Sequence, residues 1–112
     1  MTILVTGASG FLGRHLVDKL LLREYAVRTL SRSRGGLPPH VEHIQGDIRD
    51  VTLLEAAMAG VETVYHAAAM VPGAGSDTGM WDTNVTGTRS VAQACLRAGV
   101  LRLVLVSSVA VY

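Results

Sequence analysis

The chain has 112 residues, of which 49% are hydrophobic and 4% aromatic, and its formal net charge is +1. This length accommodates one domain at most. The ten basic residues are scattered along the chain, so neither a nucleic-acid-binding nor a membrane-binding face is predicted. The single cysteine, Cys95, excludes a disulfide framework and favours a reducing compartment.

The apolar runs are too short or too interrupted for targeting or anchoring segments. The first run, which starts at Thr2, is broken at Gly7 and has no basic leader, so we expect no signal peptide. No stretch reaches the roughly 18 continuous apolar residues of a membrane span. We therefore expect a soluble, cytoplasmic protein that has no membrane partner.

Strand and helix patterns alternate along the chain. Short β-rich apolar runs bounded by turn residues predict strands, and apolar residues at helical spacing predict helices. The predicted strands cover residues 2–6, 26–31, 41–45, 62 to about 66, and 101–108, and the predicted helices cover 11–23, 51–58 and 81–98. Asp50 is predicted to cap the second of these helices, and Gly99 to end the third.

This order of elements predicts an α/β fold. Strands that alternate with covering helices form a doubly wound parallel sheet with right-handed crossovers, known as the Rossmann fold. The sequence contains five such strands, so the fold is predicted to be truncated after the fifth, with the spatial order 3-2-1-4-5.

The sequence TGASGFLG places three glycines between the first strand and the first helix. Gly7 would permit a tight turn, Gly10 the close approach of a pyrophosphate, and Gly13 close packing of helix on strand. The N–H groups at the helix start would face the anion. A dinucleotide site is therefore predicted, with a glycine-rich turn that binds no ligand as the alternative. Arg14 and His15 follow Gly13 where a Walker loop needs Lys and Ser or Thr, which excludes that loop.

The end of the second strand indicates which dinucleotide binds. Sites that prefer NAD usually carry an acidic residue about 20 residues after the glycine loop. Here the sequence is TLSRSR, which has Arg32 and Arg34 and no acid. A guanidinium suits the 2′-phosphate of NADP(H) through charge-assisted hydrogen bonds. We expect NADP(H) rather than NAD(H), with a solvated arginine loop as the alternative.

Five motifs occur in order along the chain: TGASGFLG, GDIRD, HAAA, NVTGT and VSSVAVY. On these motifs the whole chain resembles the N-terminal part of the extended short-chain dehydrogenase/reductase family. That family includes sugar-nucleotide epimerases and dehydratases, 3β-hydroxysteroid dehydrogenases and dihydroflavonol-reductase-like enzymes. The resemblance implies an oxidoreductase or epimerase that moves hydride to or from a nicotinamide coenzyme. It makes residues 1–112 the N-terminal portion of an NAD(P)-binding domain, without the substrate-binding lobe.

The resemblance also implies roles for individual positions. Coenzyme would be held at the pyrophosphate, adenine and nicotinamide ends by Gly7, Gly10, Phe11, Leu12, Asp47, Ile48, Ala67, Ala68, Ala69, Asn84 and Ser107, with Arg32 at the 2′-phosphate. Asn84 and Ser108 would be catalytic, and Ser108 would hydrogen-bond the substrate oxygen. For Asp47, a turn or helix-start acid is the alternative.

The family's chemistry also needs a tyrosine and a lysine spaced YxxxK on the helix after the fifth strand. Tyr112 lies only four residues beyond Ser108 and is not expected to be that tyrosine, and the one lysine, Lys19, lies on the first predicted helix. We therefore expect this chain alone to bind coenzyme without turning over substrate. A non-catalytic NAD(P)-sensing module of the same fold is the alternative function.

Other features of the sequence give weaker indications. His40 and His43 flank a strand start rather than sharing a helix face, so no metal site is predicted. His66 is predicted to be packed or bonded to a loop. The apolar residues that bracket the 70–79 loop could line a pocket for an apolar small-molecule substrate or could simply anchor the loop; they are Met70, Val71, Met80 and Trp81.

The fifth predicted strand is an apolar edge when the chain is taken by itself. Such an edge invites pairing or aggregation. We therefore expect the isolated chain to be marginally stable or to self-associate, and the full-length form to be a homodimer candidate.

Overall fold

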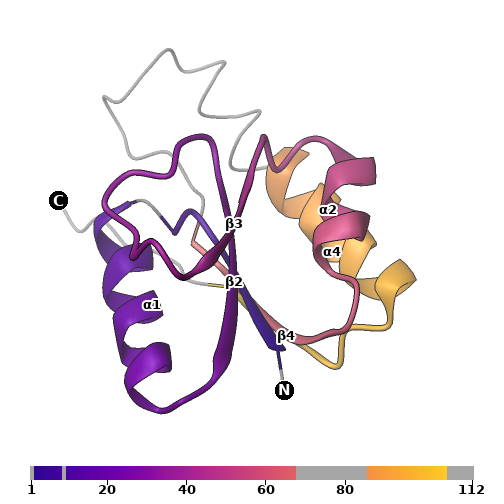
Figure 1. Cartoon of the computed structure of the whole chain (residues 1–112). Helices are drawn as coiled ribbons and strands as arrows, with labels where there is room; N and C mark the ends of the chain where they lie inside the picture. The colour runs from indigo at the N-terminus through magenta and orange to yellow at the C-terminus, as the bar shows by residue number, and fades with distance from the viewer. Residues whose placement is uncertain (1, 9, 68–85, 106–112) are drawn as a thin grey trace, which may run out of the picture.

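Five parallel strands form one sheet in the computed structural model, which describes residues 2–8, 10–67 and 86–105 (Figure 1). Their order, β3-β2-β1-β4-β5, confirms the predicted one. The strands are β1 (Thr2–Thr6), β2 (Ala26–Ser31), β3 (Glu42–Gln45), β4 (Val61–His66) and β5 (Arg102–Leu105). The helices are α1 (Phe11–Leu22), α2 (Val51–Ala57) and α4 (Gly87–Ala98).

The predicted boundaries agree with the structure to within a residue wherever both ends are described. Asp50 caps α2 as predicted, because its carboxylate accepts the N–H of Leu53 at 3.1 Å. Gly99 ends α4 in the left-handed conformation, with φ of 74°. The predicted start of the third helix and the predicted end of the fifth strand both lie outside the described residues.

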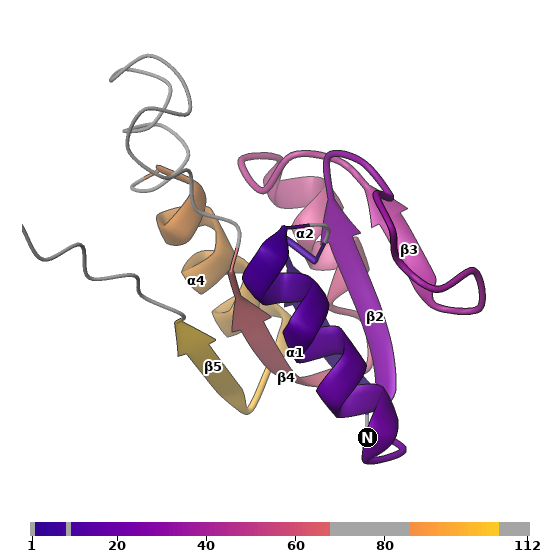
Figure 2. The same cartoon turned by 90° about the vertical axis from the view of Figure 1, so that its left-hand side faces the viewer.

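Helix α1 covers one face of the sheet (Figures 1 and 2). Ile3 and Val5 of β1 point to this face, where they pack with Val17 and Leu20 of α1. Because strand side chains alternate between faces, Leu4 points the other way. Each of these fully buried side chains stabilises the fold by about 1.5–3 kcal/mol.

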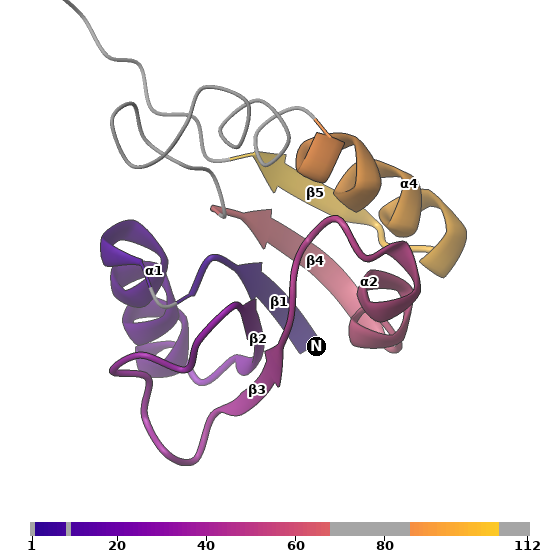
Figure 3. The ribbon, with the colours of Figure 1, turned by 90° about the horizontal axis from the view of Figure 1, so that it is seen from above.

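Helices α2 and α4 cover the opposite face, as the view from above shows (Figure 3). Leu54 of α2 and Val91 of α4 are completely buried beside Leu4 and Val64. Cys95 of α4 is buried in the same cluster, and burial raises the pKa of its thiol.

The helices that connect the strands on the two sides of β1 lie on opposite faces of the sheet. The chain passes from β1 to β2 through α1 on one face, and from β3 to β4 through α2 on the other. The strand order therefore reverses between β1 and β4, which pair directly. In open α/β sheets, ligands bind in the crevice beyond the carboxyl ends of the strands at such a point.

Strand β5 lies at one edge of the sheet. Leu101, just before it, and Leu105, at its end, are 81% and 54% exposed. The self-association expected for the isolated chain stays a prediction. No helix within the described segments has the length and apolar character needed to cross a membrane.

Candidate functional site

The turn after β1 is built on Gly7. Its φ of 68° lies in the left-handed region that favours glycine. The N–H of Gly7 donates to the carbonyl of Leu30 at 2.9 Å, which fixes the turn beside the end of β2. The N–H of Gly10 then donates to the carbonyl of Gly7 at 3.1 Å and closes the turn at the start of α1.

Gly13 and Gly10 are glycines for different reasons. A Cβ on Gly13 would lie 2.1 Å from the carbonyl oxygen of Gly7 and 2.9 Å from Cα of Ala8, so α1 can approach the turn only with glycine there. A Cβ on Gly10 would have its nearest neighbour at 3.4 Å, an ordinary contact. The packing of the protein therefore does not require glycine at Gly10, whereas a ligand that approaches this backbone closely would.

The amino end of α1 can receive an anion. The first hydrogen bond of the helix joins the N–H of Arg14 to the carbonyl of Gly10. The N–H groups of Phe11, Leu12 and Gly13 therefore have no acceptor within the helix. Gly10 is the N-cap residue; among the described residues no side chain caps this end of the helix, and its first turn carries no acidic residue. Partial positive charge therefore faces the edge where the strands end.

A buried polar chain joins the ends of β1 and β4 to α4. Thr6 Oγ1 accepts the N–H of Ala67 at 3.2 Å and lies 2.8 Å from Nδ1 of His66, while His66 Nε2 lies 3.0 Å from Oγ1 of Thr88. We infer that the Thr6 hydroxyl donates to Nδ1, which puts the imidazole proton on Nε2. Burial lowers the pKa of His66, so the ring is neutral. His66 is the packed histidine that was predicted.

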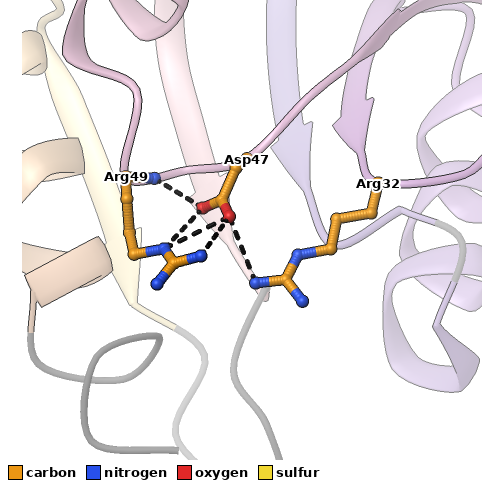
Figure 4. A network of polar contacts seen from close by, with 3 residues as sticks. All are labelled: Arg32, Asp47 and Arg49. Atoms are coloured by element: carbon orange, nitrogen blue, oxygen red, sulfur yellow. Dashed lines mark hydrogen bonds and ion pairs between the residues drawn. The ribbon is translucent and has the colours of Figure 1, made fainter. Parts of the chain in front are cut away.

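Asp47 follows β3 and lies between two arginines (Figure 4). Its Oδ1 accepts the backbone N–H of Arg49 at 2.9 Å, and its Oδ2 accepts Nη2 of the same residue at 2.6 Å. Nη2 of Arg32 reaches Oδ2 from the other side at 3.3 Å. The hydrogen bonds from Arg49 lower the pKa of Asp47 to about 2, against a smaller opposing effect of burial. The carboxylate is therefore anionic at neutral pH.

The contacts of Asp47 bear on both interpretations of this residue. The bond to the N–H two residues ahead is a local turn, as the alternative interpretation expected. Arg49 holds both oxygens at short range, whereas the bond from Arg32 is longer and the Arg32 side chain is 60% exposed. An adenine amino group would therefore most easily replace Arg32. Adenine binding by Asp47 stays a prediction.

The two arginines of the TLSRSR sequence differ in their surroundings. Arg34 donates through Nη2 to the carbonyl of Pro38 at 2.7 Å and of Val41 at 3.3 Å, so it holds its own loop in shape. Ser31, where an acid would stand in an NAD site, is buried and donates to the carbonyl of Ser33 at 2.6 Å. Arg32 alone of this sequence reaches the Asp47 edge.

Sequence reasoning placed some residues correctly and missed others. Ile48 is 5% exposed and packs in the core beneath α2, so the predicted contact of its side chain with adenine would involve a small surface. Arg49 was missed, although an arginine two residues after an aspartate in GDIRD can fold back on it. Five predicted site residues lie outside the described residues: Ala68, Ala69, Asn84, Ser107 and Ser108.

Two further features lie away from this edge. Where the chain is described, no group of three or more potential metal ligands occurs, and Nδ1 of His43 is 2.9 Å from the hydroxyl of Thr29. A hollow of about 370 Å³ is lined by residues of the late part of α1 and the starts of β4 and β5, including Lys19, Glu62 and Arg102. This hollow therefore lies at the amino ends of the strands, whereas the glycine turn lies at their carboxyl ends.

The comparisons with known proteins agree with this geometry. Residues 3–112 match the model of the NAD dependent epimerase/dehydratase family. The chain belongs to this family. It is 39% identical over 107 residues to the human sterol-4-alpha-carboxylate 3-dehydrogenase, decarboxylating, and 43% identical over 113 residues to sterol demethylase protein B of Methylococcus capsulatus. In each case the match covers 96% of this chain.

A solved structure shows the same fold with a coenzyme. A short-chain dehydrogenase/reductase superfamily protein from Agrobacterium tumefaciens, with bound NAD, matches 96% of this chain with a TM-score of 0.86 and 36% identity. The chain spans about a third of these relatives: 29% of the human protein, 34% of the Methylococcus protein and 33% of the Agrobacterium chain. The resemblance to the N-terminal part of the extended short-chain dehydrogenase/reductase family is confirmed.

The two glycines provide a matched test of the turn. We expect Gly13→Ala to lower the free energy of unfolding by about 3 kcal/mol or more, because the new methyl group overlaps backbone that cannot move aside. Gly10→Ala should change it by less than about 1 kcal/mol. Urea unfolding of both variants measures the difference, and equal losses of stability would contradict the account of Gly10.

The carboxyl of Asp47 should titrate far below its ordinary pKa of 3.8, near 2. Since the pKa in the fold is lowered, the pairing stabilises the fold above pH 3.8, and this contribution is lost as the pH falls from 3.8 toward 2. Its size is at most about 1 kcal/mol, because the pair is partly exposed. A carboxyl-detected NMR titration should show the midpoint rise in Arg49→Ala. The control Arg97→Ala, which removes a distant ion pair with Glu55, should leave it in place. A midpoint near 3.8 in the unaltered chain would contradict the network.

Proposed function

We propose that this chain is the coenzyme-binding part of an oxidoreductase or epimerase that moves hydride to or from a nicotinamide coenzyme, and that the coenzyme is NADP(H). The observation that carries the proposal is the amino end of α1, where no described side chain caps the helix. The N-cap residue there is Gly10, a position at which the packing of the protein itself does not require glycine. The pyrophosphate of a dinucleotide fits both properties.

The other groups along this edge would hold the two ends of the coenzyme. Asp47 offers the adenine amino group an acceptor that is ionised at neutral pH. Thr6, itself bonded to His66, holds Ala67 at the end of β4, next to the crevice where the strand order reverses. A nicotinamide ring that passes this point would lie toward the carboxyl end of β4.

The preference for NADP(H) rests on Arg32. The loop from residue 32 to residue 41 contains no acidic residue, and Ser31 stands where an acid would bind the ribose hydroxyls of NAD. Arg32 contacts Asp47 only at 3.3 Å and is 60% exposed, so it can turn to a phosphate at small cost. When adenine takes its place on Asp47, the guanidinium becomes free for the 2′-phosphate.

The coenzyme would supply the hydride, and the residues of this chain would bind and orient it. By the family resemblance, Ser108 would hydrogen-bond the substrate oxygen, with Asn84 and Ser107 close to the coenzyme. We propose an apolar small-molecule substrate, which agrees with the sterol named for the human and Methylococcus relatives.

Calorimetric titration with NADP+ and NAD+ tests the proposal. We expect NADP+ to bind at least tenfold more tightly, and Arg32→Ala to weaken NADP+ binding by about tenfold or more while NAD+ binding changes less than twofold. Arg97→Ala is the control for loss of a remote surface arginine. Equal or tighter binding of NAD+ by the unaltered protein would overturn the NADP(H) preference, and binding of neither coenzyme would overturn the proposed function.

A further inference from the structure

A second arginine, Arg14 of α1, lies against the loop that follows β2. Arg14 lies in the first turn of α1, one turn after Gly10. A Cβ on Gly36, in the loop after β2, would lie 3.0 Å from Nη2 and 3.1 Å from Cζ of Arg14. The guanidinium of Arg14 therefore spans from α1 to this loop, and the missing side chain of Gly36 leaves the space that it occupies.

Arg14 differs from the other arginines of this region in its side-chain bonding. Arg34 is bonded to two carbonyls of its loop, Arg49 is bonded to Asp47, and Arg32 shares that carboxylate. Within the residues that the structure describes, the side chain of Arg14 makes no hydrogen bond or ion pair, although Asp18 lies four residues further along the same helix. A guanidinium without an acceptor is available to an incoming anion.

The position of Arg14 matches the place of one particular phosphate. The N–H of Gly7 is bonded to the carbonyl of Leu30, so the start of α1 and the end of β2 lie side by side. In this fold the adenosine ribose of the coenzyme lies at the end of β2. Arg14 of α1, which lies against the loop after β2, and Arg32, which directly follows β2, would therefore approach that ribose from two elements.

We propose that Arg14 is a second specificity-determining residue, which binds the 2′-phosphate of NADP(H) together with Arg32. This proposal rests on the NADP(H) preference proposed above. The two arginines differ in what binding requires of them: Arg32 must leave Asp47, whereas the Arg14 side chain has no hydrogen bond or ion pair to break among the described residues. Two guanidiniums around one phosphate also give the bidentate geometry that a single lysine cannot.

Calorimetric titration of the protein, prepared as its native source makes it, with NADP+ and with NAD+ tests this assignment. Arg14→Ala should weaken NADP+ binding by about tenfold to a hundredfold and change NAD+ binding less than twofold, since charge-assisted hydrogen bonds to the 2′-phosphate are lost. Arg23→Ala, which removes an exposed arginine at the other end of α1, should change neither. Gly36→Ala, whose methyl group would crowd the Arg14 guanidinium at 3.0 Å, should weaken NADP+ binding selectively and by a smaller factor.

Each contrary result has a separate meaning. Equal weakening of both coenzymes by Arg14→Ala would overturn the inference, since Arg14 would then act on the pyrophosphate turn. Unchanged NADP+ binding in Arg14→Ala, with weakened binding in Arg32→Ala, would also overturn it and leave the proposed function intact. No discrimination by the unaltered protein would overturn the NADP(H) preference itself. Arg14→Gln, which keeps the aliphatic stem and removes the charge, repeats the test if the alanine variant does not fold.

Discussion

The contact between the start of α1 and the turn after β1 is the constraint on which the site depends. At Gly13 the helix backbone approaches the turn so closely that a single methyl group would lie 2.1 Å from the carbonyl oxygen of Gly7. This contact sets the direction of α1, and with it the direction in which its first N–H groups point. Because Gly7 is also bonded to β2, the helix start, the turn and the end of β2 form one fixed edge.

Electrostatics complete that edge. The helix start contributes partial positive charge and Arg14 and Arg32 contribute full charges, while Asp47 contributes a carboxylate that is bonded to Arg32. The hydrogen bonds from Arg49 lower the pKa of Asp47 to about 2 and so keep its carboxyl ionised at neutral pH. A ligand that has phosphates at its centre and a base with an amino group at one end complements this distribution of charge.

Much of the fold could be predicted because the local signals agree with each other. Buried strands such as β1 are short apolar runs that end at glycine, and Asp50 and Gly99 mark helix ends by their own chemistry. The strand order followed from right-handed crossovers. Boundaries such as the start of β3, at Glu42 rather than at residue 41, depend on pairing with β2, which no local pattern contains.

The candidate site was predictable in its backbone and less so in its side chains. The glycine spacing specified the turn, because Gly7 has a positive φ and Gly13 has no room for a Cβ. The partners of individual arginines could not be read from the sequence: Arg34 bonds to its own loop, and Arg14 contacts a loop that is more than twenty residues away along the chain. These contacts depend on how α1 and the β2–β3 loop pack together.

The most direct test of the central claim is the pattern of backbone amide shifts when NADP+ is added to the protein labelled with ¹⁵N. The account predicts that the largest changes fall on Gly7, Gly10, Phe11 and Leu12, and on the residues around Asp47, with no change at Glu62 and Arg102 at the amino ends of the strands. Changes concentrated around the hollow at those amino ends, with the glycine turn unaffected, would contradict it.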